Sequence, residues 1–271
     1  MRFQWLPSSG NCLRGSVALV EVIFGFLFLS IASVACVSCS ESAREGGPRP
    51  TGRCIVVLVD HSQSTSDDHD LVQRTIQKIL SAVQDGDRFL LAPITAASGE
   101  DSKRTIDVEL PPSFPDISWN QEPIRYRKEK RNHDEQVLTR RTELQAGVES
   151  LLSEPHSALR TTIIEALRTL KPLFRTEKRD KYLIIVSDMV EDSDIANFDR
   201  QLPAPGFAPR EVERQRSNGI LPDLAGVSVY VAGALASPPG KAAAIEKFWT
   251  DYLTGTGAVV RVYSRVLPSF P

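Results

Sequence analysis

The chain of 271 residues is poor in the side chains that build zinc and redox sites. It contains four histidines and four cysteines, and all the cysteines lie in the first fifth of the chain, at Cys12, Cys36, Cys39 and Cys54. No second CxxC or HxxxH accompanies the Cys36/Cys39 pair, so the cysteines are not spaced as zinc ligands. A redox pair needs a thioredoxin-like βαβ context, whereas this pair ends an apolar run.

Catalytic motifs and a strong net charge are missing as well. The sequence has no GxSxG nucleophile elbow, no P-loop and no GxGxxG. Its formal net charge of −2 and its pI near 6.1 give no global attraction to nucleic acid or to an anionic membrane surface. With 41% hydrophobic residues, the chain can bury one full core. We therefore expect one domain preceded by a targeting segment.

The first forty residues have the order of an export signal. Two arginines precede the apolar run 22–35 (VIFGFLFLSIASVA), which ends in small residues before Cys36. The sequence SVAC at 33–36 resembles a bacterial lipoprotein signal, in which cleavage occurs before a cysteine that becomes lipidated. If it stays uncleaved, the segment 17–38 is long enough to span a bilayer. A buried core helix is disfavoured, because the run is apolar on all sides.

These interpretations divide the chain into three parts. Residues 1–39 are expected to be a signal peptide or membrane anchor, with Cys36 as the lipidation site. Residues 40–52 contain three glycines and two prolines and predict a flexible tether. Residues 53–266 are expected to form the folded domain. The predicted location is the cell envelope, with the protein exported and membrane-anchored.

Buried strands alternate with helices through the folded part. Residues 54–59 (CIVVLV) are continuously apolar and β-branched, which predicts a strand buried on both faces of a parallel sheet. Further strands are predicted at 88–94, 181–187, 227–232 and 258–263, and helical periodicity is found at 72–83, 137–151, 163–174 and 245–252. This alternation predicts an α/β fold with a doubly wound, mostly parallel sheet and helices on both faces. Residues 105–110 are a candidate for an antiparallel edge strand.

Other segments predict surface structure. The proline-rich stretches 111–126 and 202–209 are expected to be loops, and Trp119 in the first of them is a candidate interface residue. Basic residues gather between 125 and 141, but acidic residues interleave with them, so a solvated helical face is favoured over a nucleic-acid site. The acidic residues Glu191, Asp192 and Asp194 are likewise expected to face water, with additional metal ligands as the alternative. Trp249 is expected in the core.

Polar residues follow directly on two of the buried strands. Strand 54–59 runs into Asp60, Ser62 and Ser64, and strand 181–187 runs into Asp188. Ligand sites of open α/β sheets lie beyond the carboxyl ends of the strands, so the two carboxylates meet if these strands are neighbours. Thr161 precedes a predicted helix at an N-cap position. Carboxylate and hydroxyl oxygens suit Mg²⁺ or Mn²⁺ and not zinc or copper.

These residues resemble the metal-ion-dependent adhesion site of the von Willebrand factor type A (vWA) domain. That family carries DxSxS after the first strand, a threonine before a later helix, and an aspartate after the fourth strand. The matching positions here are Asp60, Ser62, Ser64, Thr161 and Asp188. The resemblance implies Mg²⁺ bound directly by the two serines, with both aspartates bonding through metal-bound waters and the threonine joining as the site switches state.

The resemblance also implies a partner. One coordination position is left open in the family, and an acidic side chain of another protein fills it. The sequence departs from the family pattern at two places, because Arg160 and Met189 stand where glycine is usual. Thr162 is an alternative to Thr161 as the threonine ligand.

The expected function is therefore non-enzymatic, metal-dependent protein binding, with Mg²⁺ bridging to an Asp or Glu of a partner protein and no nucleic acid involved. One alternative is a scaffold whose metal site is degenerate. The other is a Mg²⁺-dependent phosphoryl-transfer hydrolase, since doubly wound sheets also carry such sites. The related phosphatases need a second acid two residues after the first aspartate, and Ser62 occupies that position.

Overall fold

A computed structural model describes most of the folded part of the chain. The described residues are 51–60, 62, 69–96, 104–115, 123–154, 158, 160–234, 238–268 and 270. The predicted signal and tether up to residue 50, with the lipidation candidate Cys36, lie outside them, as do Ser64 and Trp119. Among the helices that the model describes, none has both the length and the apolar content needed to cross a membrane.

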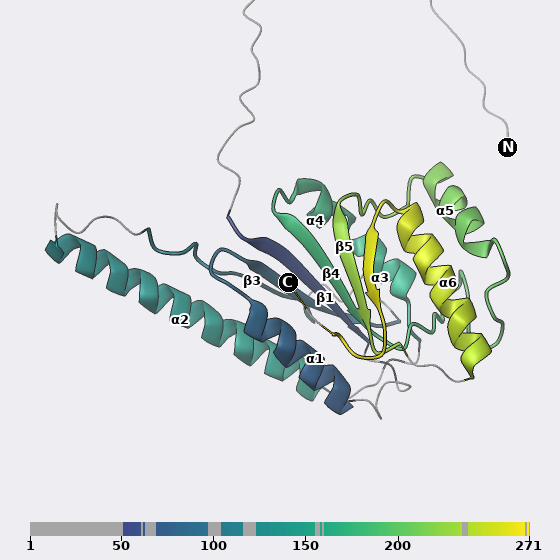
Figure 1. The fold of residues 1–271 in the computed structure, drawn as a ribbon, viewed down its shortest axis with the longest axis horizontal. Helices are drawn as coiled ribbons and strands as arrows, with labels where there is room; N and C mark the ends of the chain where they lie inside the picture. The colour runs from purple at the N-terminus through teal and green to yellow at the C-terminus, as the bar shows by residue number, and fades with distance from the viewer. Residues whose placement is uncertain are drawn as a thin grey trace, which may run out of the picture. The chain divides into compact units, whose positions relative to one another are not determined.

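A six-stranded sheet forms the centre of the domain (Figure 1). Its strands follow the order β3-β2-β1-β4-β5-β6, and β3 pairs antiparallel with β2 while all other pairs are parallel. The strands are β1 (Arg53–Asp60), β2 (Arg88–Ile94), β3 (Ile106–Glu109), β4 (Asp180–Val186), β5 (Val227–Ala232) and β6 (Val259–Tyr263). The predicted α/β fold and its antiparallel edge strand are confirmed.

Helices cover both faces of this sheet. They are α1 (His69–Ala82), α2 (Pro123–Ser153), α3 (Ile163–Thr169), α4 (Lys171–Thr176), α5 (Phe207–Ser217) and α6 (Pro239–Gly255). The hydrophobic side chains of α1 and α2 pack in one cluster, and those of α3, α4, α5 and α6 pack in a second cluster on the other face. Trp249 of α6 is fully buried in the second cluster, as predicted.

Strand β1 contributes to both clusters. Cys54, Val56 and Leu58 face the α3–α6 side, while Ile55, Val57 and Val59 face the α1–α2 side. All six side chains are at most 1% exposed. Full burial of one such aliphatic side chain stabilises the fold by about 1.5–3 kcal/mol. The strand that ends in Asp60 is therefore firmly held on both sides.

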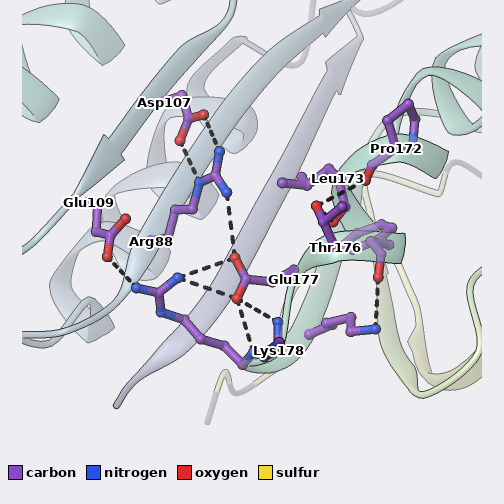
Figure 2. Close-up of polar contacts among 11 residues, drawn as sticks. Arg88, Asp107, Glu109, Pro172, Leu173, Thr176, Glu177 and Lys178 are labelled. Carbon is purple, nitrogen blue, oxygen red and sulfur yellow. Dashed lines mark hydrogen bonds and ion pairs between the residues drawn. The ribbon is translucent and has the colours of Figure 1, made fainter. Parts of the chain in front are cut away.

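The edge of the sheet where the strands begin is joined by an ionic network (Figure 2). Arg88 lies between Asp107 of β3, at 2.6 Å, and Glu177, at 3.5 Å. Arg179 pairs with Glu109 and with Glu177, the latter at 3.2 Å. These contacts connect β2 and β3 to the turn between α4 and β4. We call this side of the sheet the amino edge, and the side where the parallel strands end the carboxyl edge.

Three helical segments differ from the sequence prediction. The segment 163–174, predicted as one helix, is divided at Leu170 into α3 and α4. Helix α2 begins at Pro123, inside the stretch expected to be a loop, because proline at the first helical position lacks only an N–H that has no partner there anyway. Helix α5 begins at Phe207 in the second proline-rich stretch and was not predicted. Its sequence, FAPREVERQRS, is largely charged, and Val212 is its one buried large apolar residue, so the apolar periodicity is too weak to read.

Candidate metal centre

Asp60 is the centre of the predicted site. It is the last residue of β1 and is fully buried. Its Oδ1 accepts a hydrogen bond from the backbone N–H of Ser62 at 2.8 Å, and its Oδ2 accepts one from the Ser187 hydroxyl at 2.7 Å. The side chains of Ser62 and Thr161 lie close enough to this carboxyl group to lower its pKa. Three predicted site residues, Asp60, Ser62 and Thr161, therefore lie together.

The ionisation of Asp60 depends on this setting. Burial raises the pKa of the Asp60 carboxyl, and the hydrogen bonds from Ser187, Ser62 and Thr161 lower it in part. The net direction is upward, so the protein alone favours the charged form less than water does. A bound cation acts in the opposite direction, because its charge stabilises the carboxylate.

Three loops from different parts of the chain meet at Asp60. Ser62, in the loop after β1, forms an isolated parallel β-bridge with Ala158, in the loop before α3. The backbone oxygen of Thr161 accepts a hydrogen bond from the N–H of Asp192, in the loop after β4, at 2.8 Å. Backbone hydrogen bonding thus fixes the loops relative to one another, before any metal is considered.

The structure distinguishes the two neighbouring threonines. The Thr162 hydroxyl donates to the backbone oxygen of Thr95, at the end of β2, at 2.6 Å. The side chain of Thr161 instead lies beside the Asp60 carboxyl group, whose pKa it lowers. Thr162 is the N-cap residue of α3 but makes no side-chain capping hydrogen bond. Of the two candidates, Thr161 is therefore the one that faces the site.

Asp188 follows Ser187 just beyond β4, the strand that neighbours β1. The register of β1 with β4 pairs Val59 with Val186, so Ser187 stands beside Asp60 and Asp188 follows by one residue. Asp188 is half-buried, and its Oδ1 accepts a hydrogen bond from the N–H of Val190 at 2.9 Å. It also lines a cavity of about 100 Å³ between β6 and α6. The two predicted aspartates are thus on neighbouring strand ends.

Met189 adopts the backbone conformation of a glycine. Its φ of 66° lies in the left-handed region, and among the described residues no other non-glycine residue has a positive φ. The side chain is fully buried, which helps to offset the strain. Its N–H donates to the Ser187 hydroxyl at 2.9 Å, and its backbone oxygen accepts from Trp249 Nε1 at 2.8 Å. Met189, which stands where the vWA pattern usually has glycine, thus keeps the left-handed backbone turn that glycine would adopt.

The second departure, Arg160, contacts the loop after β4. Its guanidinium lies 2.9 Å from a carboxylate oxygen of Asp194 and 3.6 Å from one of Asp192. Asp194 is 95% exposed, as expected for a solvated acidic residue. Arg160 thus connects the Thr161 loop to the Asp188 loop through their outer sides.

The expectation for Glu191 was wrong, because this residue is fully buried. Its Oε2 accepts hydrogen bonds from the backbone N–H groups of Ile163 at 2.9 Å and Ile164 at 3.3 Å. Glu191 thus caps the first turn of α3 in place of the Thr162 hydroxyl. Burial raises the pKa of Glu191 to about 8. The contact joins residues 28 positions apart, and no local sequence pattern indicates it.

The donor set suits a hard cation. Asp60, Ser62 and Thr161 offer one carboxylate and two hydroxyls, which are the oxygen donors that Mg²⁺ and Mn²⁺ accept. Within the described part of the chain, no group of three or more histidine, cysteine, aspartate or glutamate side chains is placed to hold a metal ion. The residues present therefore fit the ion predicted from the sequence.

Comparison with known proteins gives similarities in solved structures alone. No protein-family model matches the chain. No curated protein matches it either. A von Willebrand factor type A protein from Catenulispora acidiphila is 11% identical with a TM-score of 0.43, and the match covers 78% of this chain and 38% of that one. An aerotolerance-related membrane protein from Bacteroides fragilis is 14% identical with a TM-score of 0.39, over 80% and 92% of the two chains.

The pilus adhesin SpaC from Lactobacillus rhamnosus GG, in its open conformation, is 18% identical with a TM-score of 0.34. The match covers 53% of this chain but 15% of the adhesin, so the chain spans a small part of that protein's length. With such scores, the assignment of a vWA-like α/β fold rests on the chain's own strand order and on its antiparallel edge strand.

Proposed function

We propose that the folded domain is a non-enzymatic, metal-dependent protein-binding module, displayed outside the cytoplasm from a membrane anchor. The observation that carries the proposal is the convergence on Asp60. Hydroxyls of Ser62 and Thr161, about 100 residues apart in the chain, both reach one buried carboxylate at the carboxyl edge of the sheet. Burial disfavours the charged form of this carboxylate, and a cation bound beside it would favour that form.

In this proposal Asp60, Ser62, Ser64, Thr161 and Asp188 hold Mg²⁺ or Mn²⁺. A bound ion would supply positive charge that neutral hydroxyl ligands do not cancel, and so attract an Asp or Glu carboxylate of a partner protein. The protein's own groups bind and orient. Ser187 and the N–H of Ser62 fix the two oxygens of Asp60, and Asp192 fixes the backbone of Thr161.

Hydrolysis by the same residues is the weaker proposal. A general acid or base must reach the reacting group, and Ser62 stands where the related phosphatases have their second acid. Burial raises the pKa of Glu191 to about 8, but this carboxyl group is hydrogen-bonded to the start of α3 and is fully buried. If purified protein shows phosphatase turnover that Asp60→Asn abolishes, the non-enzymatic proposal is refuted.

The metal proposal is tested by thermal unfolding of the full chain, with Mg²⁺ or Mn²⁺ and with a chelator. A ligand at a hundred times its Kd stabilises the native state by about 2.7 kcal/mol, which raises Tm by roughly 5–10 °C for a domain of this size. We expect this rise in the wild type and in the exposed control Asp223→Ala, and no rise in Asp60→Ala. An equal rise in Asp60→Ala would show that the ion binds elsewhere, and no rise in the wild type would favour the degenerate scaffold.

Partner and anchor are tested separately. Pull-down from solubilised membranes, with and without chelator, is expected to recover a partner that is lost on chelation and in Asp60→Ala. Labelling with a lipid precursor is expected to mark the wild type but not Cys36→Ser. Equal labelling of both proteins would exclude Cys36 as the lipidated residue.

A further inference from the structure

Helix α2 extends well past the sheet that it packs on (Figure 1). Its 31 residues correspond to a length of about 46 Å. Leu144, Val148 and Leu151 in its C-terminal part are buried in the core. Among its described side chains, none before Leu144 is buried. The N-terminal half of a long helix is thus exposed to solvent, and packing against the core does not account for it.

One side of this projecting half contacts the segment after β3 through two side chains. The ring of Phe114 lies 5.4 Å from that of Tyr126 and 5.2 Å from that of His133, measured between centroids. His133 Nε2 is also hydrogen-bonded to the backbone oxygen of Pro112 at 2.8 Å. Tyr126 and His133 are seven residues apart and so lie on one side of the helix, in line with the buried Leu144. The opposite side makes no such contact among the described residues.

That opposite side carries a basic and apolar face. At 100° per residue, a single stripe of the helix contains Ile124, Arg127, Lys128, Arg131, Glu135 and Leu138, which we call the basic face. All six are exposed, and Ile124 and Leu138 are 84% and 67% exposed. The stripe thus carries three cations, one carboxylate and an exposed apolar side chain at each end.

The cations of the basic face differ from neighbouring cations of α2 in their ion pairs with carboxylates. Arg125 pairs with Glu129 at 2.7 Å and Lys130 with Asp134 at 2.9 Å, both along the helix. Within the described part of the chain, no carboxylate pairs with the three cations of the basic face, Arg127, Lys128 and Arg131. On this stripe three cations stand against the one carboxylate of Glu135, so the stripe keeps a net positive charge.

The projecting half lies at the end of the domain where the N-terminal segment enters. A Cβ on Gly52 would lie 2.3 Å from the Gly86 backbone oxygen, so these two backbones touch. The Gly86 N–H donates to the Pro111 oxygen at 2.9 Å, and the next residue, Pro112, contacts His133. The entry point and the middle of α2 are thus connected at the amino edge, and Asp60 lies at the carboxyl edge.

We propose that the basic face of α2 lies on the surface of a membrane that contains anionic lipids. Guanidinium and ammonium groups bind lipid phosphates, and exposed apolar side chains enter the boundary between headgroups and acyl chains. A lipid surface accounts for both the charges and the two apolar residues. The location favours it over an acidic protein, because the helix projects at the amino edge, beside the point where the chain comes from the predicted anchor.

This inference rests on the proposed membrane anchoring and extends it. The tether 40–52 spans at most about 45 Å when fully extended, so an anchored domain stays within reach of the bilayer. Contact through the basic face would hold the domain at its amino edge. The carboxyl edge, with Asp60, would then be directed away from the lipid toward a partner.

The test uses the full chain with vesicles of phosphatidylcholine alone or with about a third of phosphatidylglycerol. Flotation of the chain with neutral vesicles measures whether the predicted N-terminal anchor attaches it to a membrane. Limited trypsin digestion then reports the basic face, through cleavage after Arg125 in α2 relative to cleavage after Arg200 in the loop before α5. We expect anionic lipid to slow relative cleavage after Arg125 about tenfold, and 0.5 M salt to restore it, since salt screens surface charge.

Two charge-matched variants complete the test. The slowing by anionic lipid is expected to disappear in Arg127→Glu/Arg131→Glu and to persist in Arg74→Glu/Arg210→Glu, which reverses two exposed cations elsewhere.

If the chain floats with neutral vesicles but cleavage after Arg125 is equal in both lipids, the inference is overturned while the anchor stands. Slowing in both lipids overturns it too, because contact would not depend on charge. Flotation with anionic vesicles alone supports the basic face and refutes the anchor.

Discussion

Replacement of Glu191 by glutamine tests the buried contact beneath the metal centre. The carboxyl group has an ordinary pKa near 4.5, and burial raises it to about 8 in the folded protein. Because the folded-state pKa is above the unfolded one, the folded protein is most stable when Glu191 is protonated in both states, below pH 4.5. That stability is lost progressively as pH rises toward 8.

The magnitude follows from the size of the shift. Each pKa unit corresponds to 1.36 kcal/mol, so the wild type is expected to lose about 4 kcal/mol between pH 5 and 8 through this group alone. Glutamine does not ionise, and its side-chain oxygen can still accept from the N–H groups of Ile163 and Ile164. Glu191→Gln is therefore expected to match the wild type at pH 5 and to be more stable by several kcal/mol at pH 8 and above.

Urea denaturation at pH 5 to 9 measures the free energy of unfolding of the wild type and of Glu191→Gln as a function of pH. A chelator is present so that metal binding does not contribute. The exposed Glu135→Gln is the control and should follow the wild type at every pH. Parallel profiles for the wild type and Glu191→Gln would refute the reasoning, because Glu191 would then have the same pKa in the folded and unfolded states.

Three further outcomes are expected. Thr161→Val should reduce the rise of Tm with Mg²⁺, whereas Thr162→Val should keep that rise. Thr162→Val should also cost about 1–2 kcal/mol of stability, because it removes the buried hydrogen bond from the Thr162 hydroxyl to the Thr95 oxygen. Paired metal titrations of the two variants check these effects. Gly52→Ala should destabilise the fold by at least about 1 kcal/mol in urea denaturation, since its φ is 97° and the added Cβ would lie 2.3 Å from a backbone oxygen. Burial raises the pKa of the Cys54 thiol to about 12, so mass spectrometry should find Cys54 unalkylated at pH 8 until the protein unfolds.

The sheet could be predicted because each of its central strands is a continuous apolar run. Such runs indicate burial on both faces without knowledge of what covers them. Helix α5 was missed because it packs mainly through Ala208 and Val212, and its other residues are mostly charged. Pro123 was predicted to be part of a loop, although proline is also favoured at the first position of a helix.

Part of the candidate site could also be located from local sequence. Asp60 and Ser62 follow a recognisable strand, and Thr161 precedes a recognisable helix, so local sequence locates them. Glu191 lies in a run of acids that looks solvated, and its burial depends on two N–H groups at the start of α3. Contacts between distant segments leave no periodicity in the sequence, and that is why the capping role of Glu191 was not foreseen.

Met189 gives the site a dependence on a distant residue. Hydrogen bonds run from Trp249 to Met189, from Met189 to the Ser187 hydroxyl, and from that hydroxyl to Asp60. Both hydrogen bonds of residue 189 use backbone atoms, so the route depends on the left-handed turn and on the indole of Trp249, not on the methionine side chain. Loss of the indole would remove the donor to the oxygen of residue 189 and loosen the turn that holds the Ser187 hydroxyl against Asp60. A motif search that demands glycine after the aspartate would overlook chains that keep this turn with methionine.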